Sequence, residues 1–127
     1  YIEQTQNDLF ADRQLRLMIE NGNRQVVGIV DLCSFDPLHN RAEVGIMVDK
    51  SCRRRGIGRN ALALMDEHCF RYLGIHQLFA YIAVENLPSR RLFAACGYKE
   101  SAVLKEWAHT FGGGYTDVLV VQKLNLS

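Results

Sequence analysis

Arg53-Arg54-Arg55-Gly56-Ile57-Gly58-Arg59-Asn60 is the stretch that decides the fold, because it separates a strand-like segment from a helical one. Gly56 and Gly58 lack a Cβ, so an anion can approach the backbone closely. The first amides of the following helix have no intrahelical acceptor and point toward such an anion. The arginines add donors that match phosphate oxygens. The stretch therefore predicts a strand–turn–helix unit that binds a phosphate-bearing ligand.

Length and composition favour one globular domain over residues 1–127, with 48% hydrophobic and 23% charged residues. The net charge is +1, so we expect neither nucleic acid nor an anionic membrane as a partner. No apolar run approaches the roughly 20 residues that span a bilayer. The cysteines are widely spaced and form no C-x-x-C pair, which indicates reduced thiols in a cytoplasmic protein without a metal site. They are Cys33, Cys52, Cys69 and Cys96.

Upstream of the arginine-rich stretch, the pattern predicts three strands, and a short helix could end at residues 8–12. Residues 15–19 and 25–35 are β-rich and flank the turn signal Asn21-Gly22-Asn23, so we expect a hairpin. Residues 41–49 alternate strictly, which predicts a strand with two different faces. One face carries Ala42, Val44, Ile46 and Val48, and the other carries Glu43, Gly45 and Met47.

Downstream, the pattern predicts two helices and three strands. A helix over 58–73 has its apolar stripe at Leu62, Met65, Cys69 and Leu73 and ends at Gly74. A buried strand over 77–84 follows. Asn86 can cap the second helix, which carries Pro88 in its first turn and ends at Gly97. Strands over 103–108 and 115–124 then form a closing hairpin. The order β-β-β-α-β-α-β-β indicates an α/β (α+β) domain with helices packed on a mixed sheet.

Three interpretations of the glycine turn compete on the residues alone. A P-loop requires G-K-[ST], which is absent. The dinucleotide fingerprint G-x-G-x-x-[GA] is matched by Gly56, Gly58 and Ala61, but it expects an acidic residue about 20 positions later. The first acidic residue after the helix is Glu85. A solvated basic turn is the third interpretation, and the turn by itself leaves it open.

Two longer motifs give a family resemblance. Arg53-x-x-Gly56-x-Gly58 resembles the [QR]-x-x-G-x-[GA] pyrophosphate loop of the GCN5-related N-acetyltransferase (GNAT) superfamily, and residues 86–98 resemble its second signature. Tyr115-Thr-Asp117 is similar to the closing hairpin of the branch that acetylates spermidine, diamines or ribosomal-protein N-termini. The resemblance covers residues 15–124. It implies a GNAT-like, mostly antiparallel sheet whose N-terminal strand and helices are missing or shortened here.

The resemblance also implies a function. The chain would be an N-acetyltransferase that moves an acetyl group from acetyl-CoA to a primary amine by direct attack in a ternary complex. The acceptor would be a polyamine, a protein N-terminus or a small amine, and relatives are often homodimers. A non-catalytic acyl-CoA-binding module and a small Rossmann-type dinucleotide-binding protein are the alternatives. The implied cofactor-binding residues are Ile46, Met47, Val48, Arg53, Arg54, Arg55, Gly56, Ile57, Gly58, Arg59, Asn86 and Ser89.

Acyl transfer to an amine needs a proton acceptor, because an alkylammonium has a pKa of about 10. Glu43 is the predicted general base; the alternative is that it pairs with Arg41 or positions the acceptor. Glu85 and His39 are weaker candidates.

The leaving thiolate can take a proton from a tyrosine. Many relatives supply one where this chain has Phe93, which we expect to be a core residue. Tyr81 is the predicted acid, with Tyr98, Tyr115 or water as alternatives; the thiolate could also leave unprotonated, since thiols have a pKa of about 8.5. Trp107, Tyr115 and Asp117 either line the acceptor pocket or serve ordinary packing and turn roles.

Overall fold

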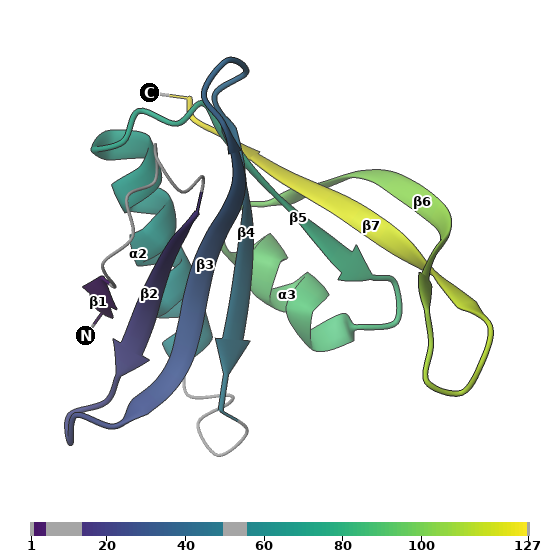
Figure 1. Cartoon of the computed structure of the whole chain (residues 1–127), viewed down its shortest axis with the longest axis horizontal. Coiled ribbons are helices and arrows are strands. Elements are labelled where there is room, and N and C mark those ends of the chain that lie inside the picture. The colour runs from purple at the N-terminus through teal and green to yellow at the C-terminus, as the bar shows by residue number, and fades with distance from the viewer. Residues whose placement is uncertain (1, 5–13, 50–55, 127) are drawn as a thin grey trace.

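The computed structural model describes residues 2–4, 14–49 and 56–126, and element labels follow Figure 1. Within these ranges a seven-stranded sheet carries two helices. The elements in chain order are β1 (Ile2–Gln4), β2 (Leu15–Glu20), β3 (Val26–Asp36), β4 (Arg41–Val48), α2 (Ile57–Arg71), β5 (Gln77–Ala83), α3 (Leu87–Ala95), β6 (Lys99–His109) and β7 (Tyr115–Leu124).

The sheet is mixed and mostly antiparallel, as predicted. Its strand order is β1-β2-β3-β4-β5-β7-β6, and β4 with β5 is the parallel pair. A dinucleotide-binding Rossmann unit requires successive parallel strands joined by helices. The antiparallel meander β1–β4 therefore rules out the Rossmann alternative.

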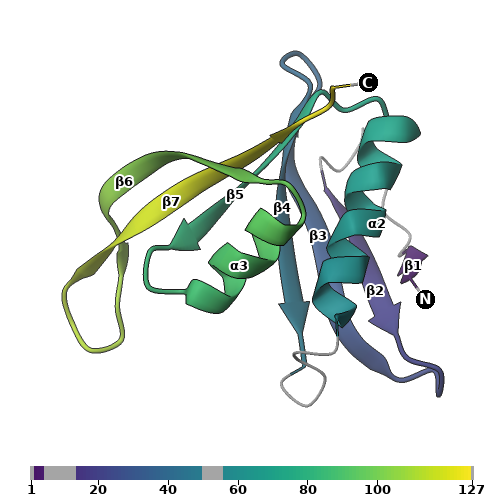
Figure 2. The ribbon, with the colours of Figure 1, turned by 180° about the vertical axis from the view of Figure 1, so that it is seen from behind.

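Both helices pack on the same face of the sheet (Figures 1 and 2), and the core lies between helices and strands. The predicted stripe of the first helix is confirmed: Leu62, Met65 and Cys69 are fully buried, and Leu73 packs at the edge of the core. The sheet meets them with alternating residues of β3, β4 and β5, which are Val30, Leu32, Ala42, Val44, Leu78, Ala80 and Ile82.

The predicted hairpin over residues 15–35 is also confirmed. The side chain of Asn21 closes its turn by accepting from the amides of Asn23 at 2.8 Å and Gln25 at 3.0 Å. Of the cysteines, Cys33, Cys69 and Cys96 are free thiols, and Cys52 lies outside the described residues. The described helices are too short or too polar to cross a membrane.

Two strands differ from the sequence prediction. The predicted order begins at Leu15, with the N-terminal strand of the family missing or shortened, and the structure has a short strand, Ile2–Gln4, paired with β2. Three residues are too few to show a periodicity. The strand expected over 103–108 runs from Lys99 to His109. It is the last strand of the sheet, and most of its residues are exposed, so its sequence lacks the alternation of a half-buried strand. The helix expected to end at residues 8–12 lies outside the described residues.

One charged side chain is buried in this core. Asp66 of α2 is 1% exposed and accepts hydrogen bonds from the Tyr98 hydroxyl at 2.7 Å and from Lys123 Nζ at 3.0 Å. Burial raises the pKa of Asp66, and the two partners oppose that shift. The cluster ties α2 to the start of β6 and to β7, on the side of the sheet that carries the helices.

Replacing Lys123 by methionine removes the cationic partner of a buried carboxylate. We expect Lys123→Met to lower the free energy of unfolding by roughly 2–4 kcal/mol, measured by urea denaturation. The control is Arg71→Met, which breaks an exposed i,i+4 pair with Glu67 and is expected to cost less than about 0.5 kcal/mol. Equal losses in the two variants would contradict a stabilising role for the buried cluster.

Candidate active site

The parallel strands β4 and β5 pair over only three positions and then diverge. The pairs are Arg41–Gln77, Ala42–Leu78 and Glu43–Phe79. Beyond them, β4 stays paired to β3 as far as Val48, and β5 stays paired to β7 as far as Ala83. Figures 1 and 2 show the two strands separating toward their carboxyl ends. An extended ligand can add to such an edge through its own amide groups.

Helix α2 begins beside this divergence, and within residues 56–126 no side chain caps its first backbone amides. Its N-cap is Gly56, which provides no side-chain cap and has a φ of 75°, in the left-handed region. The first intrahelical bond runs from the Asn60 amide to the Gly56 carbonyl at 3.0 Å, so the amides of residues 57–59 precede it. The first turn carries no acidic residue. This helix end has the polarity and the donors that bind an anion.

Gly58 explains why the helix end lies so close to β4. A Cβ built at this position would lie 3.4 Å from Val48 Cγ2, 3.6 Å from Leu92 Cδ2 and 3.8 Å from Ile46 Cδ1. The first turn of α2 is therefore packed against both the end of β4 and helix α3. Among the predicted loop residues, Gly56, Ile57, Gly58 and Arg59 come together here, whereas Arg53, Arg54 and Arg55 lie outside the described residues.

Helix α3 starts at the opposite side of the divergence, just after β5. Asn86 caps it by accepting from the Ser89 amide at 3.3 Å, which confirms the predicted cap. Further along the helix, Phe93 is buried and packs edge-to-face on the Tyr98 ring, with 4.9 Å between ring centres. Phe93 is thus a core residue, as predicted.

Glu43 lies on the face of the sheet opposite the helices, at the last paired position before β4 and β5 separate. We call this the front face. Across the sheet Glu43 is paired with Cys33 of β3. Desolvation raises the pKa of Glu43, and a hydrogen bond with the Cys33 thiol partly offsets that shift. Arg41, the ionic partner of Glu43 in the alternative interpretation, instead lies 3.8 Å from Asp36.

The tyrosines predicted as acids have different environments. Tyr81 is 46% exposed on the front face, and its ring packs edge-to-face on Phe79 with 5.8 Å between centres. Tyr98 is buried, and the combined effects of desolvation and Asp66 raise the pKa of its hydroxyl far above the ordinary value. It is therefore no proton donor at neutral pH. Tyr115 lies at the far end of the β6–β7 hairpin and is 64% exposed.

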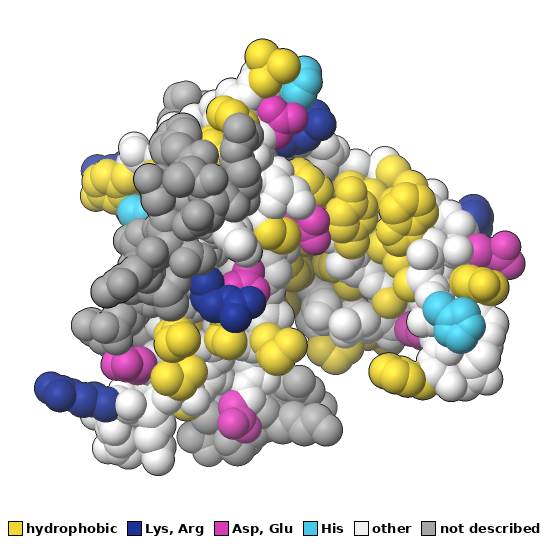
Figure 3. All heavy atoms as spheres, viewed as in Figure 1, with side chains coloured by type: hydrophobic (Ala, Val, Ile, Leu, Met, Phe, Trp, Pro, Cys, Tyr) yellow, Lys and Arg dark blue, Asp and Glu magenta, His cyan; other side chains and the backbone are white. Residues whose placement is uncertain are grey.

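On the front face, Glu43 is therefore paired across the strands with Phe79, where the strands begin to part. Tyr81 is the next residue on the same face of β5. Figure 3 shows hydrophobic side chains gathered on this face over the β5–β7 half of the sheet. Sequence reasoning singled out Glu43 and Tyr81 but missed Phe79 and the Cys33 contact. Strands over 25–35 and 77–84 were predicted, but the faces of Cys33 and Phe79 and the register that makes both residues neighbours of Glu43 required the structure.

The other candidate bases lie away from this row. His39 is in the β3–β4 turn, where its amide donates to Asp36 at 3.1 Å, at the paired end of β4. Glu85 is exposed in the β5–α3 loop. Of the two roles left open for Trp107 and Tyr115, burial in the core does not apply, because both are more than half exposed near the end of the hairpin.

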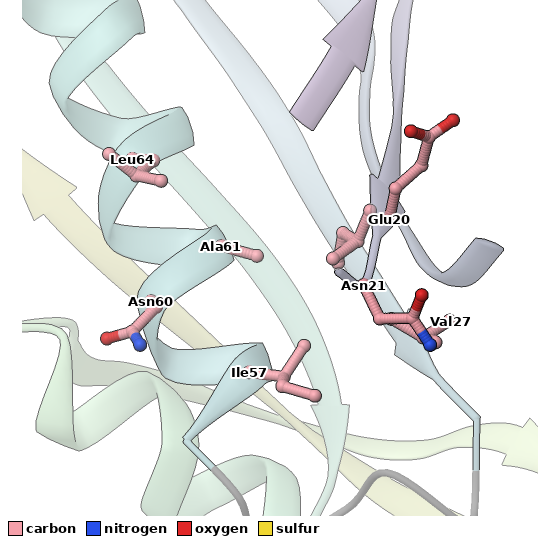
Figure 4. A pocket seen from close by; sticks show the side chains of 8 residues that line it. Glu20, Asn21, Val27, Ile57, Asn60, Ala61 and Leu64 are labelled. Atoms are coloured by element: carbon pink, nitrogen blue, oxygen red, sulfur yellow. The ribbon is translucent and has the colours of Figure 1, made fainter. Parts of the chain in front are cut away.

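A shallow hollow of about 160 Å³ lies on the other flank of α2 (Figure 4). Residues at the end of the β2–β3 hairpin line one side, and the first two turns of α2 line the other. It is separate from the divergence, since Gly58 meets β4 and α3. The lining residues are Ile19, Glu20, Asn21, Val27, Ile57, Asn60, Ala61 and Leu64.

Comparison with known proteins agrees with this geometry. The family of acetyltransferase (GNAT) domains matches residues 1–99, and the chain belongs to this family. Spermidine N(1)-acetyltransferase of Vibrio cholerae is 27% identical over 103 residues, covering 81% of this chain and 59% of the relative. An N-acetyltransferase 9-like protein of Nematostella vectensis is 38% identical over 96 residues, covering 68% of this chain and 48% of the relative.

Solved structures show the same fold. A dodecameric spermidine N-acetyltransferase from Vibrio cholerae superimposes with a TM-score of 0.85 and 25% identity, covering 92% of this chain and 68% of that chain. The present chain spans roughly half to three-fifths of the curated relatives it matches, between 48% and 59% of their length. These matches establish the family and the fold of the described residues.

A carboxylate at the start of α2 tests the anion site. We expect Gly56→Glu and Gly58→Glu to abolish binding of coenzyme A in calorimetry, because the new charge repels the diphosphate and its side chain fills the approach to the amides. Gly56→Glu also costs about 1–2 kcal/mol of stability, because position 56 is left-handed. Gly112→Glu, where a Cβ has open space, is the charge-matched control. Unchanged affinity in both variants would contradict the assignment of this loop.

Proposed function

We propose that the chain is an N-acetyltransferase that moves an acetyl group from acetyl-CoA to a primary amine by direct attack in a ternary complex. The observation that carries the proposal is the divergence of β4 from β5 beside the bare amides that begin α2. The divergence suits an extended arm that carries amides, and the helix end suits a diphosphate. Acetyl-CoA carries both groups in one molecule.

In this proposal the diphosphate rests on the amides at residues 56–59, helped by Arg53, Arg54, Arg55 and Arg59. The pantetheine arm lies along Ile46, Met47 and Val48, the part of β4 that β5 leaves unpaired. Asn86 and Ser89 border the arm from the start of α3. A backbone amide of residues 46–48 would polarise the thioester carbonyl, as an oxyanion hole does.

The acceptor would approach from the front face, where Glu43 lies. A carboxylate that is half-buried at the point of divergence can take a proton from an alkylammonium and leave a neutral, nucleophilic amine. Tyr81 is the proposed donor to the departing thiolate, since it shares this face and Phe93 is committed to the core. The bond that forms is amide C–N, and the bond that breaks is thioester C–S.

For the acceptor, we propose a polyamine such as spermidine as the first choice, because spermidine N-acetyltransferase of Vibrio cholerae matches this chain both in sequence and in structure. A protein N-terminus or another small amine is the next. We place the reaction in the cytoplasm, where free thiols such as Cys69 and Cys96 stay reduced. We also propose self-association as a homodimer, to be tested by sedimentation at several protein concentrations.

A non-catalytic acyl-CoA-binding module is the second candidate, because Phe93 supplies no proton donor from α3. A thiol-release assay with acetyl-CoA and a panel of polyamines, amino-acid amides and peptides separates the two. We expect amine-dependent release of coenzyme A. Binding of coenzyme A in calorimetry without turnover of any amine would favour the binding module.

The pH dependence of kcat tests Glu43. The base acts only when ionised, so a raised pKa places the acid limb of the profile above the ordinary value near 4.5. Activity is then lost as pH falls through the raised pKa. We expect Glu43→Gln to remove this limb and to lower kcat by roughly 100-fold with little change in the KM for acetyl-CoA. The control is Glu67→Gln on the exposed side of α2. An unaltered profile in Glu43→Gln would exclude Glu43 as the base.

A further inference from the structure

The hairpin of β6 and β7 contains a large bulge whose only opposite residue is Asp117. Leu104 is paired with Val118, and pairing resumes at Ala108 with Thr116. Residues 105–107 of β6 therefore stand opposite Asp117 alone. A bulge leaves backbone groups without ladder partners and sharpens the local twist.

The Asp117 side chain replaces the missing ladder partner. One carboxylate oxygen accepts from the Glu106 amide at 2.9 Å, and the other accepts from Lys105 Nζ at 3.1 Å. Glu106 has a φ of 51°, a left-handed conformation that persists in a non-glycine residue only where neighbours hold it. The two donors also lower the pKa of Asp117, the Glu106 amide first, so the carboxylate is ionised at neutral pH.

The backbone of Asp117 connects the bulge to the candidate active site. Its carbonyl accepts from the Val84 amide at 3.0 Å, in the loop that leads from β5 to Asn86 at the start of α3. Asp117 thus joins the bulge in β6 to the loop that ends one side of the divergence. A shift of the bulge would be passed to this loop through a single residue.

The bulge also sets the direction of the end of the hairpin. Figures 1 and 2 show the β6–β7 ribbon twisting sharply before its loop, which extends past the end of β5. β5, which forms one border of the divergence, points toward this loop, whereas β4 runs away from it. The hairpin end is rich in exposed rings: Trp107 is 61% exposed, Phe111 is fully exposed, and His109 packs edge-to-face on Tyr115. Exposed rings suit a cationic or apolar amine.

We propose that Asp117 is a positioning residue that selects the acceptor amine, because it fixes the bulge and with it the aromatic end of the hairpin, which extends past the end of β5. This inference rests on the proposed acetyltransferase function. Asp117 touches neither substrate, and its effect passes through Glu106 and Trp107. Loss of its carboxylate would therefore raise the KM for the amine and leave the KM for acetyl-CoA nearly unchanged.

Three variants separate the backbone bond from the ion pair. Asp117→Ala loses both interactions, Asp117→Asn keeps a side-chain oxygen for the Glu106 amide, and Lys105→Met loses only the exposed ion pair. We expect Asp117→Ala to raise the KM for spermidine at least about fivefold with the KM for acetyl-CoA within about twofold. Asp117→Asn and Lys105→Met are expected to remain near wild type. An alanine variant with wild-type KM values, or with both KM values raised equally, would overturn the proposal.

Hydrogen exchange at the Glu106 amide gives a readout that does not need turnover. Exchange is expected to accelerate in Asp117→Ala and to stay slow in Asp117→Asn; protection that survives in the alanine variant would overturn the role of Asp117.

Trp107→Ala keeps the Asp117 contacts and is expected to raise the KM for spermidine, which covers the case of an alanine variant that does not fold. Wild-type protein that acetylates no amine would refute the proposed function itself, whereas normal turnover with unchanged KM values in Asp117→Ala and Trp107→Ala would refute acceptor selection alone.

Discussion

The early end of the β4–β5 pairing is the constraint on which the rest of the site depends. Past the divergence, β4 keeps its pairing to β3 as far as Val48 and β5 keeps its pairing to β7 as far as Ala83, so each separated edge belongs to its own half of the sheet. Behind the divergence, the first turn of α2 packs on β4 and α3 at Gly58 instead of on a continuous sheet. The first amides of α2 therefore lie beside the gap in strand pairing between β4 and β5. Glu43 lies at the last paired position before that gap.

Charge in this chain acts locally. The net charge is only +1, but charged residues are concentrated at particular places. Arginines gather at residues 53–59, Asp66 is buried between Tyr98 and Lys123, and Asp117 binds the backbone of the β6 bulge. The buried cluster is on the helix side and stabilises the packing of α2, whereas Asp117 shapes the last hairpin. Their different burial explains their opposite pKa shifts: desolvation raises the pKa of Asp66, and hydrogen bonds lower the pKa of Asp117.

Most of the correct sequence predictions came from patterns among residues that are close together in the chain. The stripe of α2, the Asn86 cap and the hairpin turn at Asn21 depend on residues within a few positions of one another, and all three were confirmed. The face of Glu43 followed from the strict alternation of residues 41–49 in the same way, whereas the shared face of Glu43 and Tyr81 came from the pairing of β4 with β5. The strand Ile2–Gln4 and the full extent of β6 escaped prediction because one is too short and the other too exposed to show a period.

By itself, the sequence determined the two helices, the strands from Leu15 onward, their order and the glycines at the start of α2, because propensity, periodicity and capping are properties of neighbouring residues. Tertiary structure decided where β4 and β5 part, that Cys33 and Phe79 border Glu43, and that three residues of β6 stand opposite Asp117. It also removed Tyr98 from the candidate acids by burying its hydroxyl against Asp66. These features depend on the register between strands that are distant in the chain, which only the packing of the whole sheet against its helices fixes.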